Sequence, residues 1–199
     1  MKIGAALTVC DTWIDLESLY LNIARLQLRV YHIRDCESLT TPKLAQVGIS
    51  ATAVVTKVEK IDAECDLALY CPHYIFRTMA LAGAVLLRMA KALRSISAFD
   101  MAAAYGPYLF QAISLLKRMS VEENDGPSRM ARIFSRLWTT DEAFQPDHIE
   151  PDGAQTPILG LRVHSRLSMS ILHDTTRWYH HLFENGAADS VAASKNGKR

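Results

Sequence analysis

The fold is decided by residues 74–94, which read YIFRTMALAGAVLLRMAKALR. Apolar side chains recur every three or four residues from Ile75 to Leu93, and further apolar residues fill most of the remaining circumference of a helix. A helix that is apolar on nearly all sides has to be buried on nearly all sides. The stretch therefore predicts the central helix of an all-α bundle, beginning at Pro72.

Helical spacing of apolar residues continues before this central helix. We expect a first helix that starts at Asp11 and Thr12, whose side chains would cap its free amide groups, with Asp15 placed for a capping box. A second helix is expected to start at Thr41–Pro42, because proline in the first turn loses no hydrogen bond. The β-branched residues 54–56 leave an extended end to this helix open.

Two further helices are expected directly after the central one. The fourth helix spans residues 99–119 and is interrupted at Gly106–Pro107, where proline removes a backbone hydrogen bond and a kink or a break is expected. Residues 124–127, Asn-Asp-Gly-Pro, predict a turn that leads into a fifth helix over residues 128–138.

A last long helix is expected over residues 161–183, ended by Asn185–Gly186. The first helix contributes a stripe that includes Leu16 and Tyr20. The sequence thus predicts a bundle of about six helices, in which residues 1–184 form one domain. Its core is expected to contain Leu19, Ile23, Leu26, Leu86, Met89, Ile113, Leu116, Ile133, Leu137, Ile171 and Leu172.

Two segments depart from the helical pattern. Residues 139–160 contain five acidic residues, three prolines and no lysine or arginine, which is typical of a solvated loop before the last helix. The alternative is a segment that binds a partner through Phe144 and Ile149. Residues 185–199 are small and polar, and we expect a disordered tail.

Composition argues against several classes of function. The chain has 22 basic and 21 acidic residues, a net charge of +1, so its surface as a whole does not predict nucleic-acid binding. The longest apolar run, residues 79–87, is far shorter than the about 20 residues that a membrane span needs. Residues 3–10 faintly resemble a signal peptide but no cleavage site follows, so we expect an intracellular protein.

Metal binding is not predicted. The four cysteines form no C-x-x-C pair, and reduced thiols are expected. The alternative metal sites are Cys65 and Cys71 with His73, or a histidine pair such as His173 and His180 on the last helix.

Catalysis is not predicted either. Residues 124–132 resemble the metal-binding motif of terpene cyclases, but Arg132 occupies the third ligand position and would repel Mg²⁺. The chain contains no nucleophile elbow, no phosphate-binding glycine loop and no H-E-x-x-H motif. We therefore expect a protein that is not an enzyme, with no catalytic, cofactor-binding or metal-binding residues.

The last predicted helix carries a polar row. Arg166, Ser170, Asp174 and Trp178 are spaced by four residues and therefore share one side. A guanidinium, a hydroxyl and a carboxylate beside an apolar stripe indicate a partly buried network that joins neighbouring helices. The alternative is a pocket for a small polar effector. If Asp174 pairs inside the fold, Asp174→Ala should cost roughly 1–3 kcal/mol.

Three stretches together resemble one family. They are residues 74–94, residues 112–129 (AISLLKRMSVEENDGPSR), and residues 166–174 (RLSMSILHD). Their order is similar to the carboxy-terminal part of the regulatory (middle homology) region of fungal binuclear zinc-cluster transcription factors. The closest group is the one related to leucine-biosynthesis and weak-acid-stress regulators.

The resemblance implies a helical transcription-regulatory domain in the nucleus. It implies control of an amino-terminal DNA-binding module through protein contacts, in some members in response to a small-molecule effector. The six-cysteine zinc module is missing here, so zinc is expected only in such a module and specific DNA binding by this chain alone is not. We expect the chain to be a fragment of a longer protein. The alternative is a helical protein–protein interaction module with no link to transcription.

Overall fold

The computed structural model describes residues 2–34, 42–95, 99–140, 144 and 168–185, and within these ranges every regular element is helical. The predicted all-α fold is therefore confirmed. The elements in chain order are α1 (Lys2–Arg29), α2 (Tyr31–Arg34), α3 (Pro42–Cys65), α4 (His73–Ser95), α5 (Phe99–Arg118), α6 (Gly126–Thr139), α7 (Ser170–His180) and the π-helical turn η1 (His181–Asn185).

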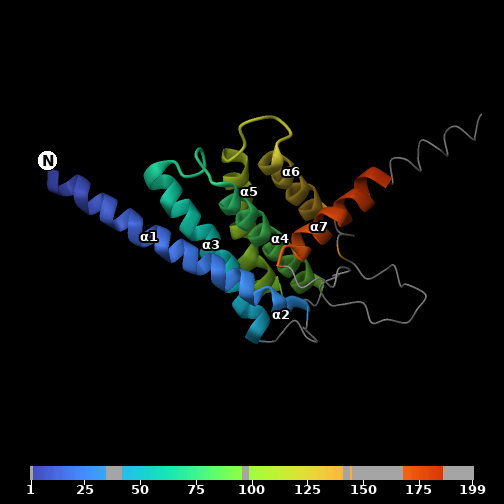
Figure 1. The fold of residues 1–199 in the computed structure, drawn as a ribbon. Coiled ribbons are helices and arrows are strands. Elements are labelled where there is room, and N and C mark those ends of the chain that lie inside the picture. Colours follow the sequence, from blue (N-terminus) through green and yellow to red (C-terminus); the bar gives the residue numbers. More distant parts are fainter. Residues whose placement is uncertain (1, 35–41, 96–98, 141–143, 145–167, 186–199) are drawn as a thin grey trace, which may run out of the picture.

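Helix α4 forms the centre of the bundle, as its apolar circumference predicts. Every residue from 78 to 91 is buried, and α3, α5, α6 and α7 all contact this helix (Figure 1). The predicted core residues are buried in the structure, except for Leu172, which is half-buried. Burial on all sides is the reason that two cations in this helix, Arg88 and Lys91, lie inside the fold.

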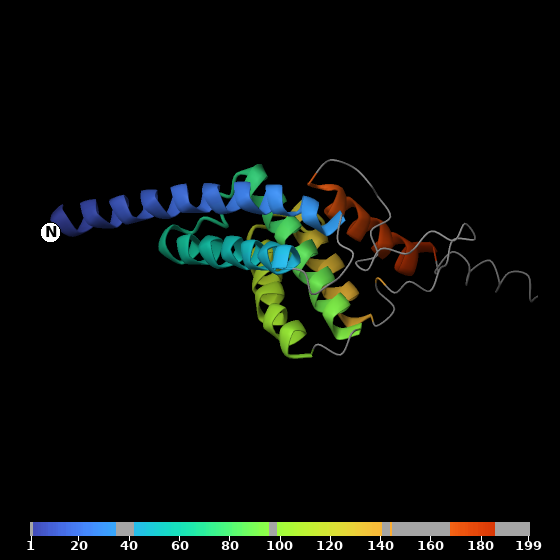
Figure 2. The same ribbon diagram turned by 90° about the horizontal axis from the view of Figure 1, so that it is seen from below.

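Helix α1 is longer than predicted and lies on the outside of the bundle along α3. It starts at Lys2, so Asp11 and Thr12 lie within the helix and are not its caps. The preceding residues include strong helix formers such as Ala5 and Leu7, which allow the helix to continue past the polar pair. Both views show its amino-terminal part extending beyond the other helices (Figures 1 and 2).

Two side chains of α1 have roles that differ from those predicted. Asp15 forms ion pairs with α3 instead of a capping box. Tyr20 is half-exposed, and its ring stacks on Tyr74 at the start of α4 with centroids 5.6 Å apart. The stripe that includes Leu19 and Ile23 is buried as expected.

Helices α3 and α5 are both continuous at the positions where the sequence indicated that helical structure could end. The β-branched residues 54–56 remain helical. Helix α5 runs through Gly106 and Pro107, so the expectation of a break at this point is wrong. Leu109 and Leu116 are fully buried beyond the proline, and this packing against α4 outweighs the one missing backbone hydrogen bond.

The turn before α6 matches its prediction. Asn124 has a positive φ of 76°, and Asp125 is the N-cap, its carboxylate accepting a hydrogen bond from the Ser128 amide at 2.9 Å. Burial alone would raise the pKa of the Asp125 carboxyl. The amides of Ser128, Val121 and Glu122 donate to it and lower that pKa below its usual value.

Asp125→Ala is expected to destabilise the protein by about 1 kcal/mol, because the first amides of α6 lose their acceptor. Asp125→Asn keeps a side-chain oxygen at this position and should cost less. Urea unfolding followed by circular dichroism measures both variants. Equal losses for alanine and asparagine would contradict a capping role.

The last long helix begins later than predicted, at Ser170, and its final turn is π-helical. Residues 161–167, nearly all of the acidic loop 139–160 and nearly all of the tail 185–199 lie outside the described residues. No helix among the described residues is long and apolar enough to cross a membrane.

Candidate functional site

The polar row of α7 leads to a buried ion pair between α7 and α4. Nη2 of Arg88 lies 2.5 Å from Oδ2 of Asp174, and the two side chains are 1% and 0% exposed. Nε of the same guanidinium donates to Oγ1 of Thr175 at 2.9 Å. That hydroxyl in turn donates to the carbonyl of Ile171, so the polar groups form a connected network.

Aromatic rings close this network from outside. The guanidinium carbon of Arg88 lies 4.3 Å from the centre of the Phe144 ring, and Phe144 packs edge-on against Trp178. Burial lowers the pKa of Arg88 to about 10, while the neighbouring Asp174 carboxylate opposes that shift. The guanidinium therefore keeps its charge at neutral pH. The two charges pair with each other and are almost fully buried, which is the arrangement that the predicted structural network requires.

The sequence indicated that Asp174 is part of a buried network, but it did not identify Arg88 as the partner. Asp174 is internal, as its position beside the apolar stripe indicated. Its partner is Arg88 of α4, whereas Arg166 of the same row lies outside the described residues. Arg88 is 1% exposed, so its charge cannot contribute to a basic surface that attracts nucleic acid.

Other basic side chains of α4 to α6 contact neighbouring groups of the protein, and of these Lys91 alone is buried. Nζ of Lys91 donates to the carbonyl of Thr140 at 2.7 Å, and the Arg94 guanidinium stacks over Trp138 at 4.0 Å. The remaining contacts are Arg118 with Asp62, Arg132 with Asn124, and Arg136 with Tyr179.

The alternative metal sites do not assemble among the described residues. These residues contain no group of three histidine, cysteine or acidic side chains close enough to hold a metal ion. Sγ of Cys65 contacts the carbonyl of Ile61 at 3.2 Å. Burial raises the pKa of the Cys71 thiol to about 11, so this thiol stays protonated at neutral pH.

The cyclase-like string also has a structural explanation. Asn124 is the residue of positive φ in the turn, and its side-chain oxygen accepts a hydrogen bond from Arg132 at 2.9 Å. The Arg132 guanidinium therefore lies beside Asn124, the first ligand position of that motif, where its charge would repel a metal ion.

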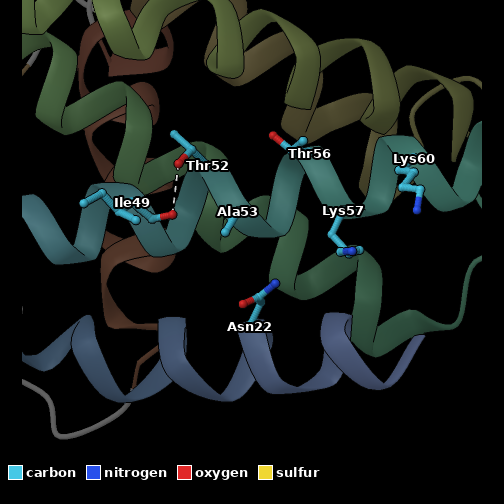
Figure 3. Close-up of a pocket in the computed structure, with 7 residues that line it drawn as sticks. All are labelled: Asn22, Ile49, Thr52, Ala53, Thr56, Lys57 and Lys60. Carbon is cyan, nitrogen blue, oxygen red and sulfur yellow. Dashed lines mark hydrogen bonds between the residues drawn. The ribbon is translucent and has the colours of Figure 1, made fainter. Parts of the chain in front are cut away.

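A second candidate site is the outer surface formed by α1 and α3. A groove of about 330 Å³ lies between these helices (Figure 3). It is lined by Asn22, Ile49, Thr52, Ala53, Thr56, Lys57 and Lys60. Its lining is shallow and mostly uncharged, which is typical of a surface that contacts another protein and unlike a catalytic cleft.

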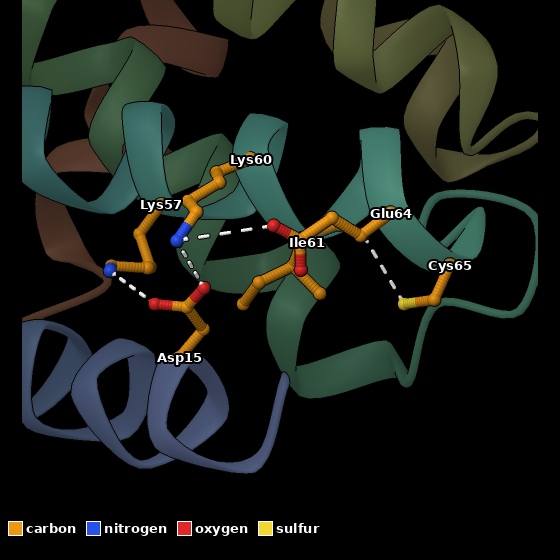
Figure 4. A network of polar contacts seen from close by, with 6 residues as sticks. All are labelled: Asp15, Lys57, Lys60, Ile61, Glu64 and Cys65. Carbon is orange, nitrogen blue, oxygen red and sulfur yellow. Dashed lines mark hydrogen bonds and ion pairs between the residues drawn. The ribbon is translucent and has the colours of Figure 1, made fainter. Parts of the chain in front are cut away.

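The two lysines of this groove are neutralised by α1. Nζ of Lys57 and Nζ of Lys60 lie 2.8 Å and 2.6 Å from the two carboxylate oxygens of Asp15, and Lys60 also approaches Glu64 (Figure 4). The hydrogen bonds from Lys57 and then Lys60 lower the pKa of the Asp15 carboxyl. This cluster fixes α1 on α3 and does not form an anion site, because the cations already share a carboxylate.

Exposed apolar residues continue along α1 beyond this groove. Ile14, Leu21 and Leu28 are 62%, 51% and 70% exposed, and Ile49 on α3 is 60% exposed. We did not predict this surface, because the sequence analysis considered only the apolar stripe that packs in the core, on the other side of the helix. The signal was present as a seven-residue spacing of large aliphatic residues on the opposite side.

Comparison with known proteins adds no relative. No protein-family model matches this chain, and no curated protein and no solved structure matches it. The fold and the two candidate sites therefore rest on the structure alone, and the family resemblance of residues 74–94, 112–129 and 166–174 is carried forward as a proposal.

Proposed function

We propose that this chain is a transcription-regulatory domain of the fungal zinc-cluster type that lacks the DNA-binding module. In this proposal it acts in the nucleus through protein partners or through its own DNA-binding module, and a small-molecule effector can modulate it. It is not an enzyme, it needs no cofactor of its own, and zinc belongs to the DNA-binding module.

The supporting observation is that the three stretches that carry the resemblance pack against one another. Arg88 of the first stretch pairs with Asp174 of the third. A Cβ atom added to Gly126, in the second stretch, would lie 3.1 Å from the Phe76 ring of the first. Residues that resemble one family therefore meet around α4, although they are far apart in the sequence.

Such packing is consistent with the resemblance, because stretches that belong to one regulatory domain have to share a core. A long-range ion pair that is fully buried requires both partners and a specific helix arrangement. The resemblance thus involves parts of α4, α5, α6 and α7 that share a core, as well as local sequence.

A second candidate function is a helical interaction module without a role in transcription. Several exposed apolar side chains on α1 and α3 favour it, since apolar side chains gathered on the surface of a folded protein mark sites of protein contact. Both candidates act by binding proteins, and only an effect on gene expression separates them.

The test is a reporter assay in fungal cells. The chain is fused to an unrelated DNA-binding module that carries its own activation segment, and reporter output is compared with that of the module alone. A regulatory domain should change the output severalfold, because it controls the module to which it is attached.

Two variants serve as controls in this assay. Asp174→Ala breaks the core pair and should abolish the change, whereas Val121→Ala, at an 82% exposed position of the turn before α6, should preserve it. Equal amounts of each fusion are verified by immunoblotting. Reporter output that the wild-type chain leaves unchanged would contradict the transcriptional proposal and favour the interaction module.

A further inference from the structure

Helix α1 presents a heptad stripe to solvent. Ile14, Leu21 and Leu28 are separated by seven residues each and are all more than half exposed. They lie on the side of the helix opposite Leu19 and Leu26, which are fully buried against the rest of the bundle. Large aliphatic residues at this spacing supply one of the two apolar positions of each heptad along which a second helix packs.

The position of α1 leaves this stripe accessible in the described structure. Both views show α1 on the outside of the bundle, with α3 beside it (Figures 1 and 2). Trp13, which precedes Ile14, is also exposed, at 64%. Apolar side chains gathered in one row on a folded protein mark an interaction surface, whereas single exposed ones do not.

Two charges flank the centre of the stripe. Glu17 and Arg25 are both exposed, four residues before and four residues after Leu21. Within the helix, neither has an opposite charge three or four residues away. On the helical wheel they lie on opposite sides of Leu21, each about 40° from it at 100° per residue.

We propose that the outer face of α1 binds the same face of a second copy of this chain, antiparallel, about a two-fold axis at Leu21. The axis places Leu21 against Leu21 of the other copy, and Ile14 beside Leu28 of the other copy. It also brings Glu17 of each copy level with Arg25 of the other, so that both charge pairs form at once. Self-complementarity of this kind is the requirement for a two-fold interface.

Charge decides the orientation of the two copies. In a parallel pair, Glu17 would lie against Glu17 of the other copy, and Arg25 against Arg25. Both contacts would be repulsive. The antiparallel pair replaces these two repulsions with two attractions. This inference does not depend on a role in transcription.

The contact is small, so the dimer is expected to form in the micromolar range. A single helix pair buries less surface than the roughly 1,600 Å² of a standard interface. Sedimentation velocity of the full chain over about 1–200 µM at physiological salt covers the corresponding dissociation constants. A concentration-dependent shift from monomer to dimer is the expected result.

Leu21→Glu is the decisive variant, because the axis places the introduced carboxylates of the two copies against each other, where they repel. The dissociation constant should rise by at least about 30-fold. Leu21 is half-exposed, so far-ultraviolet circular dichroism and the thermal midpoint should remain close to those of the wild type. Val121→Glu makes the same kind of replacement at an exposed site away from the stripe and should leave the dimer unchanged.

Charge reversal tests the orientation. Glu17→Arg and Arg25→Glu should each weaken the dimer by about 3–10-fold, since each creates two like-charge contacts. The double variant restores both pairs and should return the dissociation constant to within about threefold of the wild type.

Three outcomes would overturn the proposal. They are a wild-type chain that stays monomeric over the whole range, a dimer that Leu21→Glu does not weaken, and a double charge reversal that is weaker than either single one. The last result would exclude the antiparallel two-fold arrangement even if a dimer forms. Since the assay uses purified chain, its outcome is separate from that of the reporter assay.

Discussion

Asp174→Ala is expected to destabilise the protein by about 3–5 kcal/mol. The carboxylate is fully buried and pairs with a guanidinium that is 1% exposed. Removal of the carboxylate leaves a cation buried without its counter-charge, and the cost of that uncompensated charge exceeds the loss of one hydrogen bond. The loss of stability expected from the structure is therefore larger than the roughly 1–3 kcal/mol expected from the sequence alone.

Urea unfolding followed by circular dichroism provides the measurement. His173→Ala is the matched control, because it changes the neighbouring, exposed residue of the same helix and should fall within about ±0.5 kcal/mol of the wild type. A change of that small size for Asp174→Ala would show that the pair is not buried in solution.

A double variant separates the charge from the packing. Arg88→Met with Asp174→Ala removes both charges and should be less destabilised than the sum of the two single variants, because no unpaired charge remains. Additive losses would instead indicate that each side chain contributes through apolar contacts alone.

Helix existence could be predicted from this sequence because apolar spacing is a local property. Residues 74–94 indicate a buried helix by composition alone, and the structure places α4 at the centre. Helix boundaries could not be predicted as well. The polar pair Asp11 and Thr12 has the chemistry of a cap, but helix-forming residues before it allow α1 to continue.

Partners of buried polar groups could not be predicted, because they depend on how helices are arranged in space. Asp174 was placed in a network from its neighbours on α7, but Arg88 is 86 residues away in the sequence. Asp62 is a similar case. It is almost fully buried, its Oδ1 accepts from the Ala68 amide, and Arg118 of α5 forms an ion pair with Oδ2.

The exposed stripe of α1 illustrates a different limit. Spacing of seven residues at Ile14, Leu21 and Leu28 is visible in the sequence. The same helix also carries a buried stripe, and only the structure shows which of the two rows faces the core. A helix with two apolar rows has two surfaces to cover, and the bundle covers one of them.

Phe134→Ala is expected to destabilise the protein by about 3–5 kcal/mol, because it leaves a cavity between α6 and α4. The ring is fully buried. It lies against Gly83, where an added Cβ atom would be 2.6 Å from Cε2 of the ring. Such a distance is too short for two carbon atoms, so the absence of a side chain at Gly83 is what allows the ring to approach the α4 backbone.

The same contact predicts a change of sign for Gly83→Ala. In the wild-type background this variant should cost about 1–3 kcal/mol, since the methyl group collides with the Phe134 ring. In the Phe134→Ala background the collision disappears, and alanine should then stabilise α4 by up to about 1 kcal/mol through its better helix propensity. Urea unfolding of the four proteins completes the cycle. Equal effects of Gly83→Ala in both backgrounds would show that the ring does not pack on the α4 backbone at this position.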